Sequence, residues 1–432
     1  MDGSGPPAPA APPARGSTRR LFTSRLWRHP DFLKLWSGQS ASLFGTAVSQ
    51  LAMPTAAITL LDAGAFEVGV LSALQFLAFP TLGLAAGVWA DRLRRRRIMI
   101  VCDCCRLLAL GSIPVAWFTG VLTIWQLYAV ALVTGVATVF FDVSYQSYLP
   151  ALVAREDLVE GNSKLEVTRS LSQVAGPGLA GLLIQAFQAA SAILVDAASY
   201  LVSVLTLLWI RSPDRRPGAG APRRGFFAEM GEGLRVVLGH RVIRLIAGAT
   251  ATSNLGSNVV FAVILLWLYR EVRLNPGQVG LIFTLAASGG VLGALVARPI
   301  GRWAGMGRTL AVSVFLTSAP TLLYPVAGLS PYPIVAVAVL SFVAQAMNPI
   351  YNVNQVSYRQ AAIPASLQGR LNATVRTFIW GTIPVGAFVG GVLGARIGLV
   401  PTIYVGAAVS ALSVLWILAG PVRVRGLPEP RA

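Results

Sequence analysis

The chain has 432 residues, of which 55% are hydrophobic and only 12% are charged, whereas a soluble domain carries about 25% charged residues. This composition excludes an ordinary soluble protein and predicts one embedded in a membrane. The net charge of +18 would suit nucleic acid, but no basic segment is interleaved with the aromatic residues that strand-binding surfaces use, so no nucleic-acid partner is expected.

Apolar segments of about 20 residues, long enough to span a bilayer as helices, recur along the whole chain. They predict an all-α membrane protein with twelve transmembrane helices, at 33–60, 67–90, 98–119, 124–149, 165–187, 190–210, 243–269, 277–300, 308–328, 333–358, 371–395 and 400–420. The predicted organisation is a disordered tail (1–28), a six-helix bundle (29–210), a linker (211–240), a second six-helix bundle (241–420) and a short tail (421–432).

Basic residues gather in alternate loops. They are dense before the first span, between the second and third (Arg94 to Arg97) and in the linker, whereas the opposite loops hold only Arg270, Arg273 and Arg396. By the positive-inside rule, both termini and the linker are predicted to be cytoplasmic. The lipid bilayer is then a partner along the whole apolar surface.

The two predicted bundles resemble each other in sequence. At an offset of 210 residues, Asn162 aligns with Asn372, Gly176 with Gly386 and Gly181 with Gly391; at an offset of 211, His29 aligns with His240, Ser42 with Ser253 and Gly45 with Gly256. Such collinear matches predict two parallel six-helix repeats, because an even number of spans returns each half to the same orientation.

Two motifs and a softer similarity connect the chain to a known family. Gly87 precedes Ala90-Asp91-Arg92 and a basic run, and Gly176-Pro177 is followed by Gly181. The first resembles the loop motif of the major facilitator superfamily, departing from it at Arg94, and the second resembles the antiporter motif of its export branches. The segments 141–162 and 196–200 are similar to the bacterial subgroup of enterobactin exporters and macrolide efflux proteins.

The resemblance implies export across a bacterial plasma membrane by a monomer, with a central cavity lined by the first, fourth, seventh and tenth spans. Polar residues at helical spacing on these four spans agree with it: Gln39, Ser42, Thr46, Gln50, Thr134, Thr138, Asn254, Asn258, Gln345, Asn348, Asn352 and Gln355. Polar stripes in lipid are either contacts between helices or a water-lined path, and we favour the path. Aromatic residues on the same spans suit large, amphiphilic, neutral or cationic compounds.

Gly87, Asp91 and Arg92 are the gating candidates. Asp91 can pair with basic neighbours or with a helix N-terminus across the two halves, closing the cytoplasmic side in one state. The alternative is simple anchoring of the loop at the membrane surface.

Four carboxylates are predicted within spans, where an acidic residue is costly and therefore a functional candidate. Asp103 has Arg106 three residues on, and Glu166 has Arg169 at the same spacing, so these two are assigned structural roles. Asp142 has no such partner and is the first candidate for proton coupling; Asp196 is the second. The alternative for Asp142 is a buried acid hydrogen-bonded to Asn352.

The chain is not expected to be an enzyme or to hold a cofactor. It contains no phosphate-binding Gly-x-x-x-x-Gly-Lys-Ser/Thr segment, its histidines are His29 and His240 alone, and no metal site is expected from these and three cysteines. The predicted function is therefore secondary efflux of amphiphilic molecules (a drug, an antibiotic or a siderophore-like metabolite), with proton antiport and alternating access. An uncoupled facilitator and a non-transporting sensor or assembly protein remain as alternatives.

Overall fold

The computed structural model describes residues 25–212, 235, 238–362 and 365–420, and these residues form helices joined by short connections. The first half comprises η2 (Arg25–Arg28), α1 (Pro30–Leu60), α2 (Ala65–Arg92), α3 (Arg95–Phe118), α4 (Ile124–Leu152), η3 (Arg155–Asp157), α5 (Leu158–Phe187) and α6 (Ala189–Trp209). Each of the six predicted spans of this half is therefore one α-helix. Residues 25–28 of the predicted N-terminal tail form η2, with Leu26 fully buried, so this part of the tail is ordered, contrary to the expectation. The rest of the two tails and most of the linker lie outside the described residues.

The second half repeats this plan with two interruptions. It comprises α8 (Arg241–Arg270), α9 (Pro276–Ala304), α10 (Met306–Ser318), η4 (Ala319–Leu323), α11 (Tyr324–Gly328), α12 (Pro333–Ala362), α13 (Ala365–Ile397), α14 (Leu399–Leu412) and α15 (Val414–Leu418). The ninth span is divided into α10, η4 and α11 around Pro320, which cannot donate a helical hydrogen bond, and α14 continues into α15 as the twelfth. The twelve-helix, two-repeat layout is confirmed.

One span differs from the others in polarity. Within the described residues, eleven helical segments are long and apolar enough to cross a membrane, and α5 is not among them although it is 30 residues long. Its first half carries charged and amide side chains, including Glu160, Asn162, Lys164 and Glu166. A helix of this length with so polar a first half must shelter that half from lipid.

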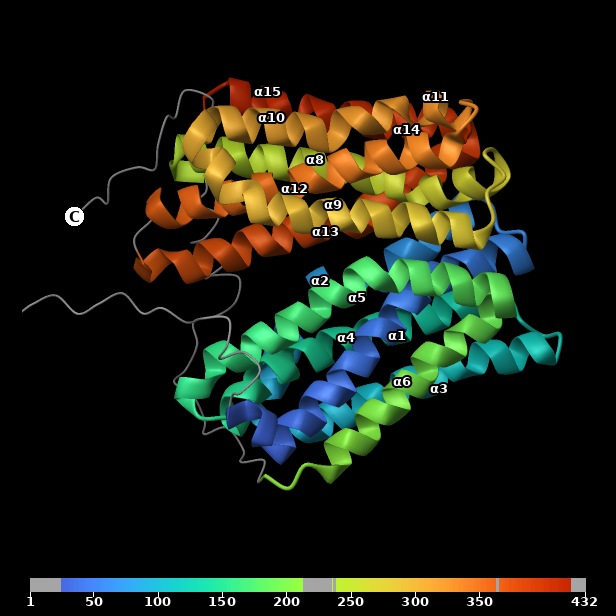
Figure 1. Cartoon of the computed structure of the whole chain (residues 1–432), viewed down its shortest axis with the longest axis vertical. Helices are drawn as coiled ribbons and strands as arrows, with labels where there is room; N and C mark the ends of the chain where they lie inside the picture. The colour runs from blue at the N-terminus through green and yellow to red at the C-terminus, as the bar shows by residue number, and fades with distance from the viewer. Residues whose placement is uncertain (1–24, 213–234, 236–237, 363–364, 421–432) are drawn as a thin grey trace, which may run out of the picture.

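The two halves lie side by side, as Figure 1 shows, with α5 of the first half against α9 of the second and α2 of the first against α13. We call the end at which α1, α5, α8 and α13 begin the basic end, because Arg94 to Arg97 lie there, and we call the opposite end the far end. The helices of the two halves meet at the far end and diverge toward the basic end.

Glycine pairs make the closest contacts between the halves. A Cβ atom added to Gly181 of α5 would lie 2.9 Å from the Cα of Gly280 on α9, and one added to Gly391 of α13 would lie 2.9 Å from the Cα of Gly69 on α2. Gly181 and Gly391 are the residues that the repeat aligns, so the two contacts are related by the same repeat. Small residues allow this close approach of two helix backbones.

Two polar contacts also join the halves at the far end. The Tyr269 and Thr55 hydroxyls lie 3.1 Å apart, and Arg270 lies 2.5 Å from the carboxylate of Asp62 while also donating to the Ala63 carbonyl at 3.0 Å. Both link α1 or its following turn to the end of α8. The far end is therefore held by polar contacts as well as by close packing.

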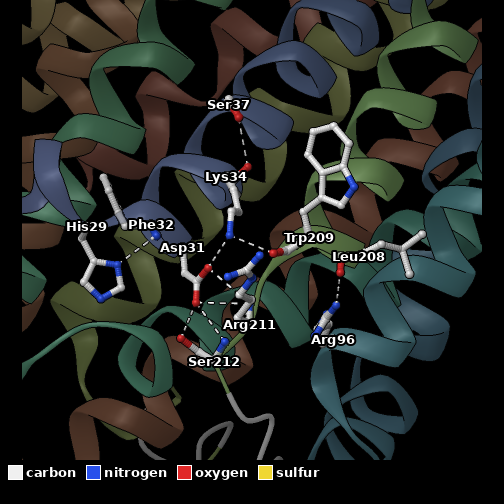
Figure 2. Close-up of polar contacts among 10 residues, drawn as sticks. All are labelled: His29, Asp31, Phe32, Lys34, Ser37, Arg96, Leu208, Trp209, Arg211 and Ser212. Carbon is white, nitrogen blue, oxygen red and sulfur yellow. Dashed lines mark hydrogen bonds and ion pairs between the residues drawn. The ribbon is translucent and has the colours of Figure 1, made fainter.

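The end of α6 is anchored to the start of α1, as Figure 2 shows. Lys34 donates to the Trp209 carbonyl at 2.8 Å and Arg96 to the Leu208 carbonyl at 2.6 Å, which satisfies two of the unpaired carbonyls at this helix terminus. Asp31 accepts hydrogen bonds from the Ser212 amide at 2.8 Å and from its hydroxyl at 2.6 Å. The chain thus leaves the first bundle from a fixed point.

Candidate functional site

The predicted cavity residues differ in exposure from span to span. On α12, Gln345, Asn348 and Asn352 are exposed, and the Asn352 amide donates to Asn348 at 2.7 Å. Gln355 is buried at the end of the same stripe, with its side-chain nitrogen 3.4 Å from the Asn352 oxygen. This helix presents neutral amides that can hydrogen-bond a solute.

The other three predicted lining helices contribute less. Gln50 is exposed; Gln39, Thr46, Thr138, Asn254 and Asn258 are half-buried; Ser42 and Thr134 are buried. Thr134 and Thr138 donate to carbonyls of their own helix, and Asn258 donates to the Asn254 carbonyl at 2.8 Å. Several of these side chains are therefore satisfied locally, which is the packing role that the sequence left open.

A buried charge cluster lies inside the first half. Arg106 of α3 is paired with Asp103, whose other oxygen accepts a hydrogen bond from Ser203 of α6 at 2.6 Å. The guanidinium also stacks between two rings, 4.4 Å from the centre of Phe141 and 4.3 Å from that of Tyr200. Asp103 is fully buried and Arg106 is 4% exposed, so this pair is shielded from both lipid and water.

Asp142, which has no basic residue at helical spacing on its own helix, belongs to this cluster. Its carboxylate interacts electrostatically with Arg106, from a half-buried position on α4. The predicted hydrogen bond to Asn352 is absent from the contacts of the described residues, since the Asn352 amide is bonded to Asn348 instead. The spacing of residues on one helix could not reveal this, because Arg106 reaches Asp142 from a neighbouring helix.

Asp196 of α6 lies in the same cluster and is 1% exposed. It also interacts electrostatically with Arg106, and it accepts a hydrogen bond from Ser199 at 3.3 Å. A Cβ atom on Gly45 of α1 would come within 2.6 Å of its carboxylate, so the glycine makes room for the acid between α1 and α6. Tyr200, one turn further along, shares a hydrogen bond of 2.9 Å with Thr46.

The cluster therefore connects four helices through one arginine. Asp103, Asp142 and Asp196 surround Arg106, and Tyr200 links the arginine to α1 through Thr46. Removing one partner of a buried ion pair leaves an uncompensated charge, so Asp103 and Arg106 depend on each other. Asp142 is the member of this group that is not fully enclosed.

The Gly-Pro motif of α5 has a clear packing role. A Cβ atom on Gly280 would lie 2.5 Å from the Pro177 carbonyl, and Gly181 meets the same glycine one turn later, while Gly176 packs against Ala47 of α1. All three motif residues, two glycines and one proline, thus lie where α5 closely contacts another helix. Gly87, Asp91 and Arg92 are in α2, but their side chains lie outside the described part of the structure.

An exposed polar stripe on α5 was missed as a site by the sequence analysis. Asn162, Glu166, Arg169 and Gln173 are exposed at steps of four, three and four residues. Within the described residues the expected Glu166–Arg169 ion pair does not form. The signal was present in the sequence, because α5 is the span whose first half is too polar for a helix that faces lipid on all sides.

No metal centre is indicated within the described residues, where no group of three or more His, Cys, Asp or Glu side chains could hold an ion. Cys102, Cys104 and Cys105 are free thiols. The chemistry available is ion pairing, proton binding by carboxylates and hydrogen bonding by amides.

Comparison with known proteins places these features in context. The sequence profile of the Major Facilitator Superfamily matches residues 35–379. The chain is 27% identical over 411 residues to the multidrug efflux pump Tap of Mycolicibacterium fortuitum, covering 92% of this chain and 95% of that one. It is 23% identical over 372 residues to macrolide efflux protein A of Streptococcus pyogenes, covering 85% and 90%.

Solved structures agree at the level of the fold. A bacterial homologue of the iron transporter ferroportin, in an inward-facing state, superposes with a TM-score of 0.72 at 17% identity, covering 92% of this chain and 99% of that chain. A bacterial homologue of the lysosomal transporter Spinster, inward-facing and occupied, gives a TM-score of 0.69 at 13% identity, covering 94% and 100%.

Proposed function

Because the chain belongs to the major facilitator superfamily and is a multi-pass membrane transport protein of a bacterial type rather than an enzyme, we propose that it exports amphiphilic drug-like molecules in exchange for protons. The similarity to Tap and to macrolide efflux protein A supports export and the substrate class. The observation that carries the proton coupling is the arginine shared by Asp103, Asp142 and Asp196.

The distribution of acidic residues supports different roles for the two halves, with proton binding in the first. Glu271 and Glu429 are the acidic residues after position 240, and both lie outside the spans in the sequence. Every carboxylate at membrane depth therefore belongs to the first half. The first half binds and releases the proton, and the second half contributes the neutral amides of α12 to the solute.

Asp142 takes the proton in this proposal, because it is the half-exposed member of the cluster. When Asp142 is neutral, Arg106 loses one of its counter-charges and is held by Asp103 and Asp196 alone. This shifts the contacts of α4 relative to α3 and α6 and, through Tyr200 and Thr46, those of α1. Burial favours the neutral form of a carboxylate, so Asp142 takes a proton in one state and releases it in the other, when water reaches it.

The far-end contacts support an inward-facing state for the described structure. The basic residues assign the basic end to the cytoplasm, and the halves meet at the opposite end through Gly181, Gly280, Gly69 and Gly391. Alternating access then requires the far-end contacts to open while the basic end closes. The protein works in this scheme as a monomer, with both termini in the cytoplasm.

Proteoliposomes with a pH-sensitive dye in their lumen test the coupling. A proton gradient is imposed, and a macrolide and a panel of amphiphilic drugs are added one at a time. We expect substrate-dependent proton movement in the wild type and its loss in Asp142→Asn. Asp157→Asn, which changes a carboxylate in η3 just before α5, is the matched control and should retain the flux.

Two results would contradict the proposal. Proton movement that persists in Asp142→Asn at the wild-type rate would remove this residue from the coupling site. Drug uptake without any proton movement in the wild type would make the protein an uncoupled facilitator.

A further inference from the structure

The starting point is the two-faced surface of α5. Its inner face is occupied: Thr168 bonds to the Trp36 indole at 3.1 Å, and Lys164 pairs with Glu160 at 3.1 Å and lies over the ring of Trp27. The outer face, meaning the face turned away from the other helices of the first half, carries the stripe of Asn162, Glu166, Arg169 and Gln173, all exposed. The polar outer residues are thus not part of the packing of the first half.

The direction of this stripe follows from the contacts of α5 at the far end. Gly178 and Gly181 face Thr284 and Gly280 of α9, which sets the line along α5 that points to the second half. At 100° per residue, the polar stripe lies to one side of that line and the exposed apolar residues Leu171 and Leu182 lie to the other. The apolar side meets lipid, so the polar side faces the interior between the halves.

Among the four carboxylates predicted within spans, Glu166 is the one for which the described part of the structure shows no bound partner. Asp103 is paired with Arg106, and Asp142 and Asp196 interact with the same arginine. The Glu166 carboxylate has neither an ion pair nor a hydrogen bond within the part of the chain that the structure describes, and it is exposed. It lies eight residues into a 30-residue helix, about 12 Å from its start.

The Glu166 carboxylate needs a cation nearby, and Arg169 on the same stripe does not supply it. A long arginine side chain can extend to bring its guanidinium to water at the membrane boundary, whereas the short glutamate chain keeps its charge at its own depth. A carboxylate held at this depth is costly unless a cation is supplied. The solute itself can supply it.

We propose that Glu166 is the charge-selecting residue of the solute site and binds the protonated amine or quaternary ammonium group of a cationic amphiphile. Asn162 and Gln173 flank it on α5, and the amides of Asn348 and Asn352 on α12 contact the uncharged part of the molecule. This inference rests on the export function proposed above and narrows its substrates to cations. The proton site at Asp142 and the solute site at Glu166 are then separate carboxylates of the same half.

Two ions of matched size and opposite charge test the proposal. Binding of tetraphenylphosphonium and of tetraphenylborate to the purified full-length protein in detergent is measured by equilibrium dialysis. We expect saturable binding of the phosphonium by the wild type, weakened about tenfold or more in Glu166→Gln and by less than twofold in Arg169→Gln. Glu160→Gln, on the inner face of the same helix, should bind as the wild type does.

The opposite results are equally specific. Phosphonium affinity that is unchanged in Glu166→Gln, or wild-type protein that binds only the borate and loses it in Arg169→Gln, would overturn the inference. Neither result bears on the coupling proposal, because that proposal is tested separately by measuring macrolide-dependent proton flux in the wild type and in Asp142→Asn. Loss of flux in Asp142→Asn with unaltered phosphonium binding would support both assignments.

Discussion

Arg106 neutralises more than the aspartate that its spacing in the chain suggests. The i, i+3 pattern with Asp103 indicates a local ion pair, and that pair forms. Asp142 and Asp196 approach the same guanidinium from α4 and α6, and the rings of Phe141 and Tyr200 exclude water from it. A single buried cation thus holds three helices of the first half in relation to one another.

Replacing Arg106 should therefore destabilise the protein more than replacing an exposed arginine. Arg106→Gln leaves Asp103 buried without its counter-ion, which costs about 3–5 kcal/mol in comparable buried pairs. The measurement is the midpoint of thermal unfolding in detergent, with Arg169→Gln as the exposed control. The double variant Asp103→Asn with Arg106→Gln should recover part of the loss, because both charges are then removed together. An unchanged midpoint in Arg106→Gln would contradict a buried, paired role.

At the scale of elements, the contact between α5 and α9 explains the Gly-Pro motif physically. Gly181 meets Gly280, and the Pro177 carbonyl lies against the same glycine. The second contact, between Gly69 of α2 and Gly391 of α13, uses the repeat-related glycine. In the alternating access proposed above, the halves approach and separate at these contacts, and surfaces without side chains suit that movement because no rotamers have to rearrange.

A side chain at Gly181 should keep the far end from closing. We expect Gly181→Val to lengthen the distance between spin labels on Val121→Cys and Leu329→Cys, which are exposed far-end positions in opposite halves. The background lacks the three native cysteines. Gly391→Val should act in the same direction through the equivalent contact. Gly111→Val on α3 is the control, because nothing lies within 4 Å of a Cβ atom there. Equal distances in Gly181→Val and Gly111→Val would argue against closure through these glycines.

At the scale of the whole molecule, the polar contacts at the far end stabilise one of the two states of the alternating access proposed above. Arg270 bonds the Asp62 carboxylate at 2.5 Å and the Ala63 carbonyl at 3.0 Å. Asp62 adopts a left-handed conformation with φ of 49°, which aspartate tolerates better than most residues. These contacts exist only while the halves meet, so they favour the state in which the far end is closed.

Arg270→Gln should raise the population with a separated far end, by less than about tenfold because exposed ion pairs contribute little. The same pair of spin labels reports the two populations as short and long distances. Arg396→Gln, a cation in another far-end connection, is the control and should leave the distribution unchanged. A distribution that is identical in wild type and Arg270→Gln would show that the glycine contacts alone hold the far end.

The sequence by itself determined the twelve spans, their two-repeat order and the family. These properties depend on hydropathy and spacing along the chain, so they can be identified without knowing which way each helix faces. The repeat also anticipated particular contacts: His29 and His240 both accept a hydrogen bond from a backbone amide at the start of α1 and α8, as equivalent N-caps.

Only the tertiary structure decided which charges meet and which end of the molecule is closed. Asp142 has no basic residue at helical spacing on its own helix, and the arginine with which it interacts, Arg106, lies on a neighbouring helix. Glu166 and Arg169 were taken as a pair from their spacing, although the two side chains are separately exposed on the outer face of α5. Contacts between helices depend on the rotation and separation of their axes, and these are set by packing across the whole bundle, which no spacing within one helix encodes.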